Sequence, residues 1–190
     1  MKQMRVLTIS LLFIVCTQSY SQEFTLDKDF EISIQGTSTL HDWEMSCNEA
    51  TGSADFNIKN SKIKGVRSLT VEIKSTSLKS GKESMDENAY KALKTDSHNA
   101  ILFSLQKATS VKALEKNIYR INFEGILTVA GESRPVSSSV KCTTSTDRIR
   151  CEGSFNLQMT DFKIDPPTAL FGSIETDNNI SVFYNITYVR

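Results

Sequence analysis

A two-residue alternation of apolar and polar side chains recurs along most of this 190-residue chain and constrains its fold more than any other feature. Phe30, Ile32 and Ile34 alternate with polar residues, and 119–129 and 180–188 continue the same period. Such a period places successive side chains on opposite faces of a β-strand. The pattern predicts eight or nine strands, mostly in meander order, at 24–35, twice within 37–58, and at 66–78, 101–105, 118–129, 136–144, 148–160 and 180–188.

Strands with one apolar face each can form either a sandwich of two sheets or a closed barrel. A barrel has the further advantage that it leaves no exposed strand edge. An eight-stranded barrel can fill its interior with its own side chains or hold one elongated apolar ligand. The alternation by itself leaves these choices open.

One segment, 84–95, departs from the alternation and is predicted to be a helix. Ser84 and Glu87 have the spacing of a capping box, and Lys91 and Lys94 lie at the end where the helix dipole favours cations. A short amphipathic helix is not stable alone, so we expect it to pack on the strands. The apolar stripe available for this packing consists of Met85, Ala89, Ala92 and Leu93.

The first 21 residues have the organisation of a secretory signal peptide. Lys2 and Arg5 precede an apolar run at 6–15, and Ser19 and Ser21 are the small residues expected before a cleavage site after Ser21. The apolar run is too short for a comfortable membrane span. We therefore expect a soluble protein of the periplasm or the exterior of the cell.

Cleavage at this site would leave 22–190, a length that suits one domain with a sizeable core. Lipidation of Cys16 is the minor alternative, because Val15 is a poor match to the small residue that such a site needs. Removing the leader takes away two basic residues and leaves 20 basic against 22 acidic ones. Nothing in this charge balance indicates a nucleic-acid partner.

Three cysteines remain in the exported part of the chain. If Thr146 and Asp147 form a two-residue turn, Cys142 lies directly opposite Cys151 on the same face of a hairpin. An oxidising compartment would permit a disulfide between them. Cys47 is left as a buried or half-exposed free thiol, with exchanged pairing as the alternative.

Four segments occur in this order along the chain: GTSTLHDW (36–43), SMDENAYKALKTDSHNAILF (84–103), GILTVAGESRPV (125–136) and LQMTDFKIDPPTALFG (157–172). Together they resemble the YceI-like family of exported polyisoprenoid-binding proteins, and the likeness extends over roughly 24–188. The resemblance implies an extended, lipocalin-like, eight-stranded antiparallel barrel with the helix capping one end. It also implies an apolar tunnel for a long isoprenoid chain, such as a quinone tail or a polyprenyl lipid, or for a similar amphiphile.

The first hairpin departs from the family pattern. Many members have a strand of the type H-S-x-V-x-F followed by H-x-x-x-S-x-V-x-G, whereas this chain has GTSTLHDWEMSCNEATGSADF. We interpret this difference in sequence as a change in the tunnel mouth or first hairpin, centred on Trp43. The change affects the expected head-group preference more than the expected fold.

The predicted ligand-binding residues lie on the strand faces expected to point into the barrel and in one loop, 159–172. Pro166 and Pro167 fix an extended path through this loop, which is far more apolar than loops usually are. It either folds down as a core plug or lines the tunnel mouth, and we expect Phe162 and Phe171 to contact the ligand. The full set is Trp43, Phe56, Val71, Ile73, Phe103, Phe123, Leu127, Phe155, Leu157, Phe162, Phe171 and Val182.

A hydrolytic site would use His41 as a base oriented by Asp42, with Ser38 or Ser46 as nucleophile. No nucleophile-elbow motif surrounds either serine, and adjacent strand residues point to opposite faces. We expect His41 and His98 to make structural hydrogen bonds instead. The histidines and cysteines lack the spacing of a zinc site, and the aspartates of the apolar loop lack that of a calcium loop.

The leading hypothesis is an exported, non-catalytic carrier of an isoprenoid lipid, without a metal or a cofactor other than the bound lipid. The alternative is a packed barrel that acts as an interaction or envelope-stress module with a protein partner, and a hydrolase using His41 is a remote third. The packed barrel would have an exposed apolar patch and no tunnel. Transient membrane contact and a homodimer remain open.

Overall fold

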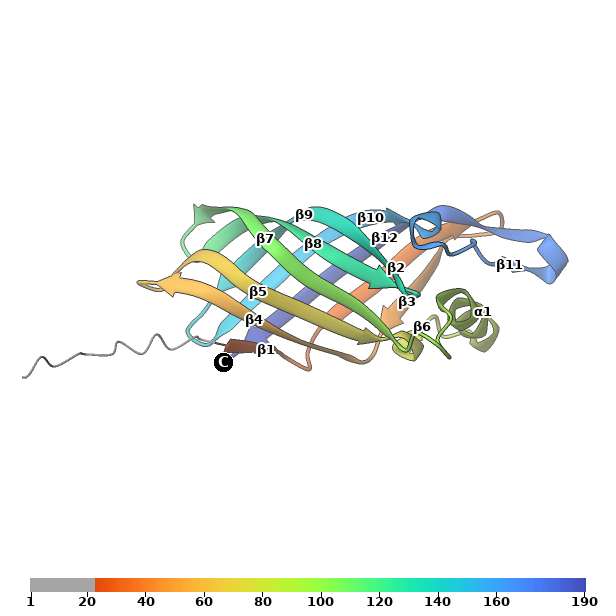
Figure 1. The fold of residues 1–190 in the computed structure, drawn as a ribbon, viewed down its shortest axis with the longest axis horizontal. Helices are drawn as coiled ribbons and strands as arrows, with labels where there is room; N and C mark the ends of the chain where they lie inside the picture. The colour runs from red at the N-terminus through yellow and green to blue at the C-terminus, as the bar shows by residue number, and fades with distance from the viewer. Residues whose placement is uncertain (1–22) are drawn as a thin grey trace, which may run out of the picture.

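The computed structural model describes residues 23–190, and Figure 1 shows their arrangement. The predicted signal peptide at 1–21, its cleavage after Ser21 and the alternative lipidation of Cys16 all lie outside the described residues. Within 23–190, no helix combines the length and the apolar character needed to cross a membrane.

The described chain forms one antiparallel β-structure that closes on itself. Eight strands form a ring in the order β1, β4, β5, β7, β8, β9, β10, β12, and β12 returns to pair with β1. The predicted all-β barrel of eight antiparallel strands with one inserted helix is confirmed. The strands are β1 (Glu23–Leu26), β2 (Glu31–Ser38), β3 (Trp43–Cys47), β4 (Ala50–Lys59), β5 (Lys62–Lys74), β6 (Leu78–Lys79), β7 (Ala100–Glu115), β8 (Ile118–Val129), β9 (Glu132–Thr144), β10 (Arg148–Gln158), β11 (Thr168–Ala169) and β12 (Ile174–Val189).

Short interruptions separate three pairs of successive strands, and only the one between β3 and β4 was predicted. β1 and β2 both pair with β12 but are separated at 27–30. β3 and β4 are separated at 48–49, and the short 3-10 helix η1 (Ser75–Ser77) separates β5 from β6. The predictions of one continuous strand at 24–35 and one at 66–78 were therefore wrong in this detail.

The helix α1 (Glu83–Leu93) lies at one end of the barrel, opposite the end that carries the C-terminus (Figure 1). Its predicted apolar stripe packs against the core. Lys94 adopts a left-handed conformation and stops the helix. Both ends of the helix therefore lie slightly before the predicted 84–95.

The predicted capping box at Ser84 is wrong. Lys82 occupies the N-cap position, and no side chain caps the helix there. Instead the Asp86 carboxylate accepts hydrogen bonds of 2.7 Å from the Ser80 amide and from the Ser80 hydroxyl. Lys79 lies 3.5 Å from the same carboxylate. Asp86 thus joins the first turn of the helix to the segment before it. These contacts take the place of the capping that Ser84 was predicted to provide.

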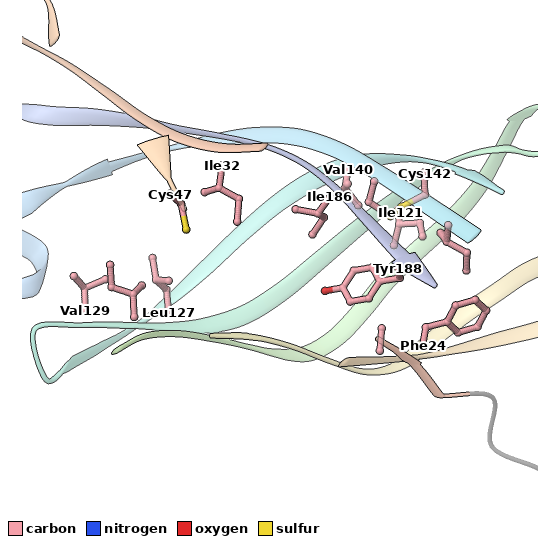
Figure 2. Packing of buried hydrophobic residues seen from close by; sticks show 14 of the residues in the cluster. Phe24, Ile32, Cys47, Ile121, Leu127, Val129, Val140, Cys142, Ile186 and Tyr188 are labelled. Atoms are coloured by element: carbon pink, nitrogen blue, oxygen red, sulfur yellow. A yellow bond between two sulfur atoms is a disulfide. The ribbon is translucent and has the colours of Figure 1, made fainter. Parts of the chain in front are cut away.

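An aromatic cluster fills the end of the barrel opposite α1. We call this end of the barrel the closed end. The Phe56 ring makes edge contacts with Phe24 at 5.5 Å and with Tyr188 at 5.9 Å between ring centroids. Each of the three side chains is at most 2% exposed. Figure 2 shows Phe24 and Tyr188 among the buried residues of this region.

Two of the cysteines reinforce the same end. The β9–β10 register places Cys142 opposite Cys151, and the two form a disulfide. Cys47 is a buried free thiol near Ser77, and burial raises the pKa of this thiol. It therefore stays protonated at neutral pH.

Candidate ligand-binding cavity

The barrel contains an apolar cavity of about 440 Å³. Inward-facing side chains from nearly every wall of the barrel line it, together with the apolar stripe of α1. Sites for small molecules and cofactors usually measure about 300–1,000 Å³. The interior thus leaves a ligand-sized space that the protein's own side chains do not fill.

All but one of the twelve predicted ligand-binding residues line this cavity. Regular strand register holds several of them in step, as in the pairs Phe103–Leu127 and Phe155–Val182, whereas Phe56 and Phe123 lie next to register shifts and still reach the lining. Contact with a ligand remains a prediction for each of them. The residues in the lining are Trp43, Phe56, Val71, Ile73, Phe103, Phe123, Leu127, Phe155, Leu157, Phe162 and Val182.

Phe171 is the exception, and the path of its loop explains why. Phe162 and Ile164 are buried, so the first part of the loop folds down as a plug. Leu170 and Phe171 then adopt positive φ angles of 49° and 56°, which turn the chain outward. The Phe171 side chain is fully exposed and does not line the cavity. This placement does not support the predicted ligand contact of Phe171.

Glycines make room for two of the aromatic side chains in the lining. A Cβ atom added to Gly125 would lie 2.5 Å from the Phe103 ring, and one added to Gly36 would collide with the Trp43 ring. The Trp43 indole also donates a 3.0 Å hydrogen bond to the Thr37 carbonyl. These contacts fix the orientation of both rings against the wall.

The mouth of the cavity lies at the helix end of the barrel. The exposed residues of the lining are His41 in the β2–β3 connection, Lys82 and Ser84 at the start of α1, and Thr168 in β11. Among the described residues that line the cavity, Lys82 is the only Lys, Arg, Asp or Glu. Any fixed charge on a ligand would therefore be best placed at the mouth.

The residues of the hypothetical hydrolase site are arranged differently from what that chemistry needs. The Ser38 hydroxyl donates to the His41 backbone carbonyl at 2.8 Å, rather than to the imidazole. The imidazole Nδ1 contacts the backbone carbonyl of Asp42 at 2.8 Å, rather than its carboxylate. These are contacts of a structured turn. Within 23–190, no three His, Cys, Asp or Glu residues gather in a way that could hold a metal ion.

The predicted site omitted two tyrosines that line the cavity, Tyr184 and Tyr188. Both belong to the even-numbered apolar row of the last predicted strand, so the sequence contained the signal. Burial raises the pKa of Tyr184 to about 12 and raises that of Tyr188 further, and both hydroxyls therefore stay protonated near neutral pH. The nearby Ser138 hydroxyl partly offsets the rise in the pKa of Tyr184. The same hydroxyl donates a hydrogen bond to the Ser154 carbonyl.

The model of the YceI-like domain family matches residues 20–187 of the chain. No curated protein sequence gives a significant match.

Solved structures with the same fold include BcnA of Burkholderia cenocepacia, at 13% identity and a TM-score of 0.67, where the match covers 85% of this chain and 98% of that one. A polyisoprenoid-binding domain from Saccharophagus degradans, implicated in plant cell wall breakdown, matches at 11% identity and a TM-score of 0.67, covering 87% and 97%. A YceI protein of Campylobacter jejuni matches at 14% identity and a TM-score of 0.60, covering 77% and 84%. At these identities the likeness shows the fold.

Proposed function

This chain belongs to the YceI-like family, and from that premise we propose that it is a carrier of a long-chain isoprenoid or a similar amphiphile. Lipid binding is the role that the family and the polyisoprenoid-binding neighbour support. The ligand would lie in the barrel cavity, with its tail along the apolar walls and without any covalent step.

The observation that carries this proposal is the apolar cavity itself. Its walls are almost entirely hydrocarbon apart from the two tyrosines and the mouth. Burial of apolar surface contributes roughly 25 cal/mol per Å², and a chain of isoprene units is apolar along its whole length. A protein-binding module with a packed interior would not need such a space, so the cavity favours the carrier over that alternative.

We further propose that ligand exchange takes place at a membrane. Two hydrogen bonds between Thr39 and Glu175 join the β2–β3 connection to β12 beside the mouth. Near this junction Leu40 is 65% exposed, Leu170 is 68% exposed and Phe171 is fully exposed. Apolar side chains held outward beside a lipid cavity suit shallow insertion into a bilayer.

Export to the periplasm or the exterior is part of the proposal. The sequence pattern of 1–21 supports it, and so does the Cys142–Cys151 disulfide, because such bonds persist mainly in oxidising compartments. N-terminal sequencing of the protein recovered from outside the cytoplasm tests this point. We expect a mature chain that begins at Gln22, whereas recovery of the intact leader in the cytoplasm would refute export.

Lipid extraction and native mass spectrometry of the purified protein test the carrier proposal. We expect a copurifying isoprenoid-type lipid in the wild type and its loss in Leu127→Trp, which places a larger ring in the cavity. Leu114→Trp is the matched control, because Leu114 is an exposed residue outside the cavity. Absence of bound lipid, together with no binding of added isoprenoids, would refute the proposal.

A further inference from the structure

The hydroxyl groups of Tyr184 and Tyr188 are not explained by an apolar tail alone. Both oxygen atoms are buried, and neither makes a hydrogen bond of good geometry with the described residues, although the Ser138 hydroxyl is close enough to Tyr184 to act on its pKa. Buried polar groups nearly always have a partner, because an unpaired one loses its hydration without compensation. Two such groups on one strand of the same cavity wall therefore point to a missing partner.

The surroundings of Tyr188 aim its hydroxyl into the cavity. The ring packs against Phe56 at the closed end and is completely buried. Figure 2 shows the hydroxyl directed away from Phe24, toward the side of the barrel interior where Ile32 and Leu127 lie. The apolar body of the ring thus seals the end, and its buried polar tip is directed toward the barrel interior.

Tyr184 lies four residues earlier on the same face of β12, nearer the mouth. Its ring extends over Gly153, the residue opposite it on β10, and a Cβ atom at 153 would lie 2.5 Å from the hydroxyl oxygen. The Phe155 ring lies 6.1 Å away between centroids. The glycine therefore allows this tyrosine to lie along the wall with its hydroxyl at the lining.

The remaining polar side chains of the lining lie toward the mouth, on the β2–β3 connection, α1, β11 and the start of β12. No Lys or Arg lines the cavity near the two tyrosines, so an anionic group there would have no counter-ion. A protonated tyrosine is a donor, and its natural partner is a neutral oxygen acceptor. The polar residues at the mouth end are Ser38, His41, Lys82, Ser84, Asn88, Thr168 and Thr176.

We propose that Tyr184 and Tyr188 form a hydrogen-bonding subsite that binds a neutral carbonyl or ether oxygen of the lipid deep in the cavity. This inference rests on the proposed carrier function and narrows its ligand class. The preferred ligand is an uncharged isoprenoid whose oxygen-bearing end, such as a ketone or a quinone ring, enters first. A pure hydrocarbon of similar size leaves the two hydroxyls unpaired and binds less tightly.

Binding of two probes to delipidated protein tests the subsite. Geranylgeranylacetone is an isoprenoid ketone, and squalene is an isoprenoid hydrocarbon without oxygen. We expect Tyr188→Phe and Tyr184→Phe each to weaken binding of the ketone by roughly three- to tenfold, the contribution of one hydrogen bond. Squalene should bind the variants as well as the wild type or better. Tyr119→Phe is the matched control, because its ring is buried but does not line the cavity.

Each substitution keeps the aromatic ring, and the ratio of the two affinities is measured within one variant, so a general loss of stability affects both probes alike. An unchanged ratio in both variants, as expected if ordered water satisfies the hydroxyls, would overturn the subsite and leave the carrier function intact. Failure of the wild type to bind either probe would overturn both.

Discussion

Different interactions stabilise the two ends of the barrel. At the closed end, Phe24, Phe56 and Tyr188 exclude water, and a disulfide joins the neighbouring hairpin. At the mouth, polar contacts between elements supplement the half-buried apolar stripe of α1 and the buried loop residues Phe162 and Ile164. Examples are the ion pair of Lys163 with Glu132 at 2.7 Å and that of Lys79 with Asp86 at 3.5 Å.

These forces differ in magnitude. Burial of a large aromatic side chain contributes several kcal/mol, whereas exposed ion pairs usually contribute about 0–1 kcal/mol each. The closed end should therefore carry the stability of the fold, and the mouth should open at much lower cost. A carrier benefits from this division, because its ligand can be exchanged without unfolding the barrel.

The largest expected effect comes from truncation at the closed end. Phe56→Ala should reduce the free energy of unfolding by about 3–5 kcal/mol, because it leaves a cavity between two aromatic rings. Urea unfolding measures this loss. Phe171→Ala, at the exposed tip of the mouth, should change stability by no more than about 0.5 kcal/mol. Equal effects of the two substitutions would contradict the division between the ends.

Loss of the disulfide should follow in size. Replacement of both Cys142 and Cys151 by Ser should reduce the free energy of unfolding by about 2–3 kcal/mol, since the bond closes a loop of sequence separation 9. Reductant should lower the urea midpoint of the wild type and leave that of the double variant unchanged. A wild-type midpoint that does not respond to reductant would show that the bond adds no stability.

A charge in the helix stripe tests the mouth. Leu93→Asp places a carboxylate in the half-buried face of α1 and should cost about 1–3 kcal/mol or accelerate ligand release. Lys91→Ala is the control on the exposed side of the same helix and should leave both quantities unchanged. Melting curves and release of a fluorescent fatty ligand provide the two measurements. If Leu93→Asp matched the wild type in both, the helix would not close the cavity.

Acid should loosen the mouth slightly. Burial opposes ionisation of Asp86, but hydrogen bonds from Ser80 and the charge of Lys79 outweigh it and hold the pKa of Asp86 below its ordinary 3.8. This contribution to stability is present above the ordinary value and is lost as pH falls through the lowered one.

We expect an effect of less than about 1 kcal/mol, because the ion pair is partly solvated. Ligand release should become faster as pH falls below about 4 in the wild type, with a weaker pH dependence in Asp86→Asn. The same acid response in Asp86→Asn would assign the effect to other groups.

The sequence alone was sufficient for the walls of the barrel. A period of two survives wherever strands pair regularly, so the inward positions of Phe103, Leu127 and Phe155 could be read from their spacing. The hairpin register that brings Cys142 and Cys151 face to face followed from the length of one turn.

Features that depend on unusual backbone angles, on particular hydrogen bonds or on the closed three-dimensional structure could not be predicted in this way. The position of Phe171 depends on two successive left-handed residues, neither of which is a glycine. The first turn of α1 is held by a hydrogen bond that the Ser80 amide donates to the Asp86 carboxylate, which a local capping rule overlooks. The two tyrosines lay in a recognised apolar row, but only the closed structure shows that their hydroxyls lack partners.

The pairing of β1 with β12 has a consequence for how the protein is made. The ring closes where Thr25 pairs with Val189. Closure therefore requires the last strand of the chain, β12, to be present before β1 can pair with it. The β8–β9–β10 meander can form from neighbouring segments, whereas closure of the seam has a high entropic cost and should be slow. Until the seam closes, the unpaired edges of β1 and β12 can pair with other chains and so promote aggregation. Under the proposed export and carrier function, the lipid would enter the barrel while this last seam is still open.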